Sequence, residues 1–138
     1  MKPSTLLTFS ALLLSHLALA ADAPLPPETI SGNISYVSGG IGKDEATAMQ
    51  EAEKSYPLSL EFAVTSRPRD EFTSDVHVKL TDRQGNTVLD TVSNGPFFLI
   101  KLPGGHYRLE ASKYGETKVR EVDIKKSAKQ KILIEWAG

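Results

Sequence analysis

The sequence predicts a mainly β protein: an antiparallel Greek-key β-sandwich of about seven strands with one short N-terminal helix. Three observations favour this fold class. Apolar and polar residues alternate in short runs between Asp75 and Trp136. Clusters of Gly, Pro, Asn and Asp separate the runs, as they do at the turns of antiparallel sheets. One run, residues 97–100, is apolar throughout, which is typical of a strand covered on both faces.

The composition fits one small domain. The chain has 138 residues, an apolar fraction of 40% and a formal net charge of -1, so it can bury a single core. It carries no excess of basic residues, which argues against nucleic acid as a partner. The absence of cysteine excludes disulfides, cysteine nucleophiles and thiolate zinc sites.

Residues 1–20 have the pattern of a cleavable signal peptide. Lys2 supplies a positive charge, residues 6–14 are mostly apolar, and residues 18–20 (Ala-Leu-Ala) form a small-residue cleavage site. The apolar stretch is shorter than the roughly 20 residues that a membrane span needs. We therefore expect cleavage after residue 20 and a periplasmic or secreted protein without a membrane span.

The rest of the chain divides into three expected parts. Residues 21–33 form a flexible Pro-rich leader, residues 34–57 a short strand and a helix, and residues 58–138 the sandwich domain. Asn33 begins a glycosylation sequon, a pattern that matters only in a eukaryotic host. The glycine-rich residues 39–44 lack the spacing of a phosphate-binding loop, and predict a turn before the helix.

The helix is expected from Asp44 to about Ser55, with Asp44 as its N-cap. Pro57 ends it, because a proline excludes the preceding residue from helical geometry. The helix is amphipathic with a thin apolar stripe. That stripe consists of Ala48, Met49, Ala52 and Tyr56.

The strands follow from the period-2 alternation. They are expected over residues 58–64, 76–80, 87–93, 97–102, 107–111, 117–124 and 132–136, with a further short edge strand over residues 34–37. The end loops, residues 65–74 and 82–86, are candidates for contact with a partner. The first of them carries Arg67 and Arg69.

The apolar run 97–100 predicts a patch on the outside of the sandwich. If Phe98, Ile100 and Leu102 face the interior, Phe97 and Leu99 face outward. Leu89 and Leu133 are expected to join them there. Because proteins seldom leave such a patch bare, we expect the helix to cover it. If the helix is solvated instead, Phe97 and Leu99 become a surface for a partner or a second copy.

Residues 94–109, Asn-Gly-Pro-Phe-Phe-Leu-Ile-Lys-Leu-Pro-Gly-Gly-His-Tyr-Arg-Leu, resemble the signature of carboxypeptidase regulatory-like domains. In that family a polar-Gly turn, an aromatic strand, a Leu-Pro-x-Gly turn and an x-Tyr-x-Leu strand follow in order. The resemblance covers about residues 76–136 and implies a transthyretin-like sandwich. The segment 39–46 also resembles small exported bacterial proteins that join such a helix to this domain, which implies a bacterial periplasm.

Two activities found near this fold do not carry over from the resemblance. The metallocarboxypeptidase domain that these modules accompany is absent, and the mature chain lacks its zinc-ligand spacing. Hydroxyisourate hydrolases share the fold but end in a Tyr-Arg-Gly-Ser-type tail, whereas this chain ends with residues 134–138, Ile-Glu-Trp-Ala-Gly.

The residues that could carry chemistry are few. His77 and His106 are the only histidines after residue 20, and the sequence does not say whether they are close. Together with Asp75 or Asp90 they could bind a metal, but no spacing forces three ligands to converge. No Gly-x-Ser-x-Gly elbow is present. We therefore expect no catalytic residues, no cofactor and no metal.

The sequence favours a non-enzymatic accessory or binding module of the cell envelope. Its partner would be an envelope protein, a peptide or a glycan, and the residues singled out for contact are Phe97, Leu99, Arg67 and Arg69. Two alternatives stay open: a small hydrolase or metal-dependent enzyme that uses His77 and His106, and a structural homodimer.

Overall fold

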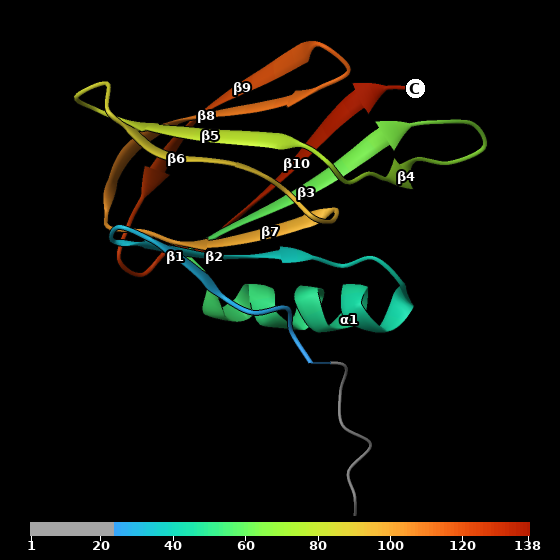
Figure 1. Cartoon of the computed structure of the whole chain (residues 1–138), viewed down its shortest axis with the longest axis horizontal. Helices are drawn as coiled ribbons and strands as arrows, with labels where there is room; N and C mark the ends of the chain where they lie inside the picture. Colours follow the sequence, from blue (N-terminus) through green and yellow to red (C-terminus); the bar gives the residue numbers. More distant parts are fainter. Residues whose placement is uncertain (1–23) are drawn as a thin grey trace, which may run out of the picture.

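A computed structural model describes residues 24–138 as two β-sheets packed face to face, with one helix on the outer face of the larger sheet (Figure 1). The signal peptide expected over residues 1–20 and the start of the leader lie outside the described residues. Within residues 24–138, no helix has the length and apolar character needed to cross a membrane.

The larger sheet has six strands in the order β1-β2-β7-β3-β10, and β4 pairs with the second half of β3. These strands are β1 Thr29–Ser31, β2 Ile34–Gly39, β3 Leu58–Thr65, β4 Glu71–Phe72, β7 Phe97–Lys101 and β10 Gln130–Ala137. The smaller sheet has the order β6-β5-β8-β9. Its strands are β5 His77–Asp82, β6 Thr87–Val92, β8 Gly105–Lys113 and β9 Glu116–Ile124.

The mainly β, two-sheet architecture agrees with the sequence, but the seven-strand Greek key is not confirmed. The structure has ten strands within residues 24–138. Two of the additional strands, β1 and β4, span three and two residues, too short to show an alternation. In addition, β10 runs parallel to β3, whereas only antiparallel pairs were expected. Alternation indicates which side chains face the core, but not the direction of the neighbouring strand.

The N-terminal part of the chain belongs to the sandwich. β1 pairs with β2, so the leader expected over residues 21–33 contains a strand near its end. β2 is not an edge strand, because it lies between β1 and β7, and its residues Ser35–Gly39 pair with Phe97–Lys101 of β7. Residues 34–39 are therefore an internal part of the larger sheet.

The main core lies between the two sheets, as the alternation predicts. Val78 and Leu80 of β5 and Tyr107 and Leu109 of β8 face Leu60 and its neighbours on the larger sheet. One side chain faces the core against expectation. Leu89 of β6 was expected on the outer face, but it lies in the main core. The register shifts beside it, since Thr81 pairs with Thr87 and Leu80 with Leu89, and this irregularity is a β-bulge that alternation does not reveal.

A second, smaller core lies under the helix. α1 spans Lys43–Ala52 and continues as a 3-10 turn over Glu53–Ser55. Met49 of α1 and Tyr56 pack with Val37, Phe97 and Leu99 of the sheet. Phe97 and Leu99 are fully buried there. The expectation that the helix covers the outer face is therefore confirmed, and these two side chains cannot form an exposed partner surface.

An ion cluster fastens the end of the helical segment to the sheet. The Lys131 ammonium of β10 lies 3.2 Å from a carboxylate oxygen of Glu61 and 3.3 Å from one of Glu53. Burial alone would lower the pKa of Lys131, but the two carboxylates outweigh it and raise the pKa above its usual range. The contact joins the 3-10 turn to β3 and β10, beside the small core.

Truncation of Phe97 tests the small core. We expect Phe97→Ala to lower the free energy of unfolding by about 3–5 kcal/mol, because it leaves a cavity where a fully buried ring was. The matched control is Leu133→Ala on the same outer face, which is 48% exposed and should change stability by less than about 1 kcal/mol. Urea unfolding followed by circular dichroism measures both. Equal losses in the two variants would contradict a helix-covered face.

Candidate functional site

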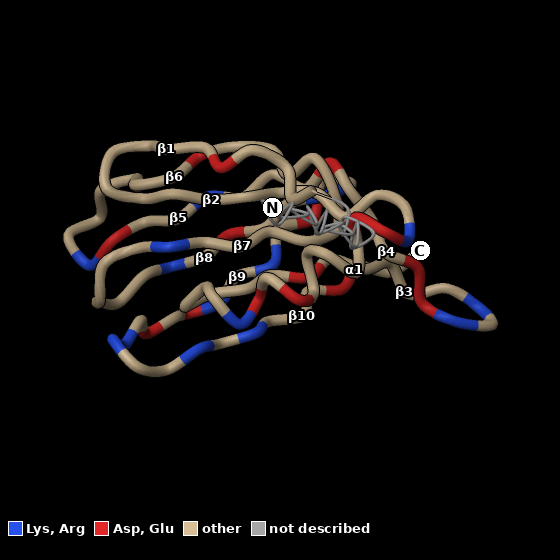
Figure 2. Tube along the Cα trace, turned by 90° about the horizontal axis from the view of Figure 1, so that it is seen from below, with Lys and Arg blue, Asp and Glu red and all other residues tan. Residues whose placement is uncertain are grey.

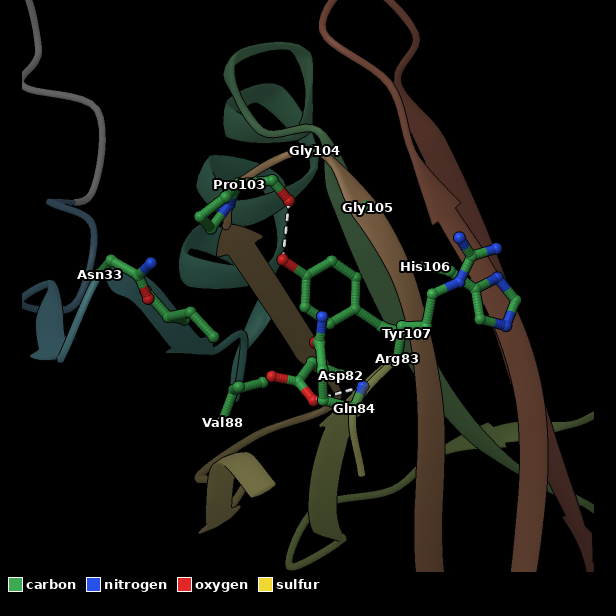
Figure 3. Close-up of a pocket in the computed structure, with 11 residues that line it drawn as sticks. Asn33, Asp82, Arg83, Gln84, Val88, Pro103, Gly104, Gly105, His106 and Tyr107 are labelled. Carbon is green, nitrogen blue, oxygen red and sulfur yellow. Dashed lines mark hydrogen bonds between the residues drawn. The ribbon is translucent and has the colours of Figure 1, made fainter. Parts of the chain in front are cut away.

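The loops at one end of the sandwich form a cleft of about 310 Å³. Three connections meet there: the β1–β2 turn, the β5–β6 hairpin and the β7–β8 turn (Figures 1 and 3). The lining residues are Asn33, Ile34, Asp82, Arg83, Gln84, Val88, Pro103, Gly104, Gly105, His106 and Tyr107. Most of them carry hydrogen-bonding groups, and Ile34 and Val88 supply an apolar wall. This is the size and the mixed lining of a small-ligand site.

The Asp82 carboxylate shapes the hairpin side of the cleft. One of its oxygens accepts hydrogen bonds from the backbone N–H groups of Gln84, at 3.0 Å, and Asn86, at 2.9 Å. Gly85 adopts a φ of 86°, which a residue with a side chain rarely takes. This arrangement satisfies the turn locally, so Arg83 and Gln84 are presented from a well-defined backbone (Figure 3).

The Tyr107 side chain holds the opposite wall. Its hydroxyl donates a hydrogen bond to the Pro103 carbonyl at 2.8 Å, which closes the turn between β7 and β8 (Figure 3). The ring itself is buried against the main core. Burial, and to a lesser extent the Asp82 carboxylate, raise the pKa of Tyr107, so the hydroxyl stays a neutral donor. The neighbouring Gly104 and Gly105 leave the backbone beside it open to the cleft.

His106, at the cleft rim, is held between two carboxylates of β9. Its register partner is Asp123, whose Oδ1 lies 2.7 Å from Nδ1 of the ring. Oε2 of Glu121 lies 2.7 Å from Nε2. A ring that donates at both nitrogens is protonated. The hydrogen bond to Asp123, followed by that to Glu121, therefore raises the pKa of His106, and the bond to His106 lowers the pKa of Asp123.

This geometry defines what the imidazole can do. While the ring is protonated, both of its nitrogens donate to these carboxylates, and His106 then has no free lone pair for a metal or for a proton from a substrate. Within residues 24–138, no group of three or more His, Asp or Glu side chains is arranged to hold a metal ion. The cleft is thus equipped for hydrogen bonding, with its charges largely balanced among its own groups.

The second histidine lies elsewhere. His77 of β5 contacts Asp90 across the β5–β6 pair, on the outer face of the smaller sheet. Its register partner on β8 is Ser112, six residues from His106, which corresponds to about 20 Å along the strand. The two histidines do not converge, and a site that needs both of them together has no geometric support.

The glycine-rich segment before α1 binds a carboxylate of the protein itself, that of Glu45. Oε1 of Glu45 accepts a hydrogen bond from the Gly40 N–H at 2.8 Å. A side chain on Gly40 would meet the Phe97 ring at 2.3 Å, and its φ of 99° also favours glycine. Asp44 is not the N-cap: that position is Gly42, and no side chain caps it. Close packing explains these glycines, in line with the turn expected from the sequence.

The loop that carries Arg67 and Arg69 lies at the opposite end of the sandwich from the cleft (Figure 1). Both arginines are exposed, and within the described residues neither forms an ion pair. A separate, more apolar hollow lies between the start of α1 and β4, and neither arginine lines it. Ile41 and Phe72 are 65% and 54% exposed beside it.

Sequence reasoning identified part of the cleft. The hairpin loop 82–86 was expected to make contacts, and it does line the cleft. Asn33 was considered only as part of a sequon, and Tyr107 only as a core residue. One feature of the sequence could have pointed to this part of the cleft, namely the Pro-Gly-Gly turn at residues 103–105. A glycine pair after a strand leaves the backbone accessible to a ligand.

The comparisons give no relative from which a role could be transferred. No protein-family model, no curated protein and no solved structure matches the chain.

The His106 cluster predicts a pH-dependent contribution to stability. A raised histidine pKa stabilises the fold below the unfolded value of about 6.5 and ceases to do so as pH rises through the folded value. The lowered pKa of Asp123 stabilises the fold above about pH 4, the unfolded value of an aspartate, and this stabilisation is lost as the pH falls through the folded value. We therefore expect Glu121→Gln/Asp123→Asn to destabilise the protein most near pH 5 and least near pH 8.5.

Urea unfolding at the two pH values measures this difference, and an NMR titration of the His106 ring should show its pKa falling in the variant. Glu116→Gln is the control, because it removes a carboxylate that pairs with Lys118 and not with a histidine. A destabilisation that is the same at both pH values would show that His106 is not held protonated by these carboxylates.

Proposed function

We propose that this protein is an exported, non-enzymatic accessory or binding module of the cell envelope, and that the end cleft is its ligand site. The signal-like residues 1–20 support export to the periplasm or beyond. The resemblance of residues 94–109 to carboxypeptidase regulatory-like domains supports an accessory role on a transthyretin-like sandwich. Fold alone does not define function, so the proposal rests on the cleft.

The observation that carries the proposal is the convergence of hydrogen-bonding groups from three separate connections. Asn33, Gln84 and the backbone at Gly104 and Gly105 offer donors and acceptors around one hollow. Arg83 adds a fixed fork of donors. Paired strands anchor both ends of each connection, which lowers the entropic cost of binding a ligand.

The charge balance indicates the kind of ligand. The cations Arg83 and His106 stand beside the carboxylates Asp82, Asp123 and Glu121, and two of these carboxylates are bonded directly to the His106 ring. Neither a strong anion nor a strong cation is favoured in such surroundings. A ligand rich in hydroxyl or amide groups fits best, which points to a glycan or an extended peptide.

Catalysis is the less favoured reading of the same cleft. An imidazole acts as a general base only through a free lone pair, and the protonated His106 ring donates both of its N–H groups to carboxylates. A hydrolase or metal enzyme that combines His77 with His106 would need the two rings to meet, and they lie about 20 Å apart along the sheet.

A homodimer is the second candidate function, and one observation favours it. The Phe72 ring packs at a tilt against the buried Phe97 ring, with centroids 5.3 Å apart, yet Phe72 and Ile41 stay largely exposed. The apolar face that α1 covers thus continues into open surface. Sedimentation at micromolar concentration distinguishes a dimer built on this surface from a monomer.

Variants of the cleft test the proposed function. We expect Arg83→Ala and Gln84→Ala to weaken binding to the best ligand from an array of peptidoglycan fragments and peptides by about tenfold, since each removes hydrogen bonds to the ligand. Arg67→Ala, in the loop at the opposite end, is the matched control and should bind like the unaltered protein. Fluorescence titration measures the affinities, and thermal unfolding verifies the folds. If only Arg67→Ala loses binding, the ligand binds at the loop that carries Arg67, and the proposal that the cleft is the ligand site is wrong.

A further inference from the structure

The turn between β9 and β10, residues 125–129, is a concentrated positive patch. It contains Lys125, Lys126 and Lys129, and Figure 2 shows the basic stretches along it. These lysines border a second hollow of about 530 Å³ at the same end of the sandwich as the cleft. The hollow is lined by Ser55, Pro57, Leu102, Pro103, Gly104, Ile124, Lys125, Lys126, Ser127, Ala128 and Lys129.

The lining is unbalanced in charge. It holds three ammonium groups and no carboxylate, although the whole chain has a net charge of -1. Elsewhere the lysines are often paired, for example Lys131 with Glu53 and Glu61. Within residues 24–138, none of the three turn lysines forms an ion pair. Lys125 attracts the Asp123 carboxylate at longer range and thereby helps to lower its pKa. Lys126 and Lys129 are therefore the two lysines whose charges are least compensated.

The hollow has a firm apolar floor. Ile124 is only 6% exposed and forms part of the main core, and Leu102 packs against that core. The turn is anchored to the start of β3, because the Gln130 N–H donates to the Pro57 carbonyl at 2.9 Å. Apolar side chains next to several like charges exclude water on one side and strengthen the attraction for an anion. Ser55 and Ser127 add hydroxyl donors at the rim.

We propose that this hollow is a binding site for the phosphate group of an organophosphate. Lys126 and Lys129 would neutralise the phosphate, and the apolar floor would carry the neighbouring carbon atoms of the ligand. The group belongs either to a free sugar or glycerol phosphate or to the headgroup of an anionic phospholipid, because both present the same chemistry. The site shares Pro103 and Gly104 with the cleft but uses none of the cleft's polar side chains, so it stands independently of the function proposed above.

The test uses two probes with the purified protein. Glycerol 3-phosphate is followed by NMR shifts of the amides of residues 124–130, and vesicles of phosphatidylglycerol are compared with vesicles of phosphatidylcholine by flotation. The variant is Lys126→Gln/Lys129→Gln. Lys43→Gln is the matched control, because Lys43 is exposed at the far end of the sandwich and forms no ion pair within the described residues.

We expect binding to at least one probe, weakened about fivefold for each lysine removed and unchanged in Lys43→Gln. Binding should also weaken several-fold between about 50 and 300 mM salt, because the lysines are exposed and screened. Binding to both probes identifies the phosphate itself as the ligand group, and binding to phosphatidylglycerol vesicles alone identifies the lipid headgroup. The proposal is overturned if neither probe binds, or if the double variant binds as well as the unaltered protein.

Discussion

The burial of β7 on both faces is the constraint on which the rest of the structure depends. Phe98 and Ile100 face the core between the sheets, and Phe97 and Leu99 face α1. A strand with two apolar faces needs a layer on each side, so neither a bare sandwich nor a free helix satisfies this sequence. The same strand explains the glycines around it. A side chain on Gly40 would meet the Phe97 ring, and one on Gly95 would meet the backbone of Gly39, in each case at 2.3 Å.

The candidate sites follow from where the strands end. β7 stops at Lys101, and the turn that follows it forms the shared wall of the polar cleft and the lysine-lined hollow. Across β8 and β9, the register places His106 opposite Asp123, so the imidazole becomes part of a charge-balanced cluster. Two neighbouring hollows thus differ sharply in charge. The first suits hydroxyl and amide groups, and the second suits an anion.

The sequence predicted those features that depend on local periodicity. The alternating runs located the main strands, and the thin apolar stripe around Met49 correctly placed the helix over Phe97 and Leu99. It could not predict the parallel pairing of β3 with β10 or the bulge that turns Leu89 inward, because these depend on contacts between distant segments. The cleft was predictable only at its hairpin loop 82–86. Its other walls come from turns that lie far apart in the chain and meet only after the sheets pack.

Native-state hydrogen exchange tests the central claim most directly, because it reports how firmly each backbone amide is held in the fold. We expect the amides of residues 98–100 in β7 to exchange among the slowest in the protein and to open only with global unfolding. The amides of α1 around Met49 should be protected as well, since the helix is packed on the sheet. If the β7 amides instead exchange as fast as those of the exposed loop 66–70, or if α1 shows no protection, β7 is not covered on both faces and the account is wrong.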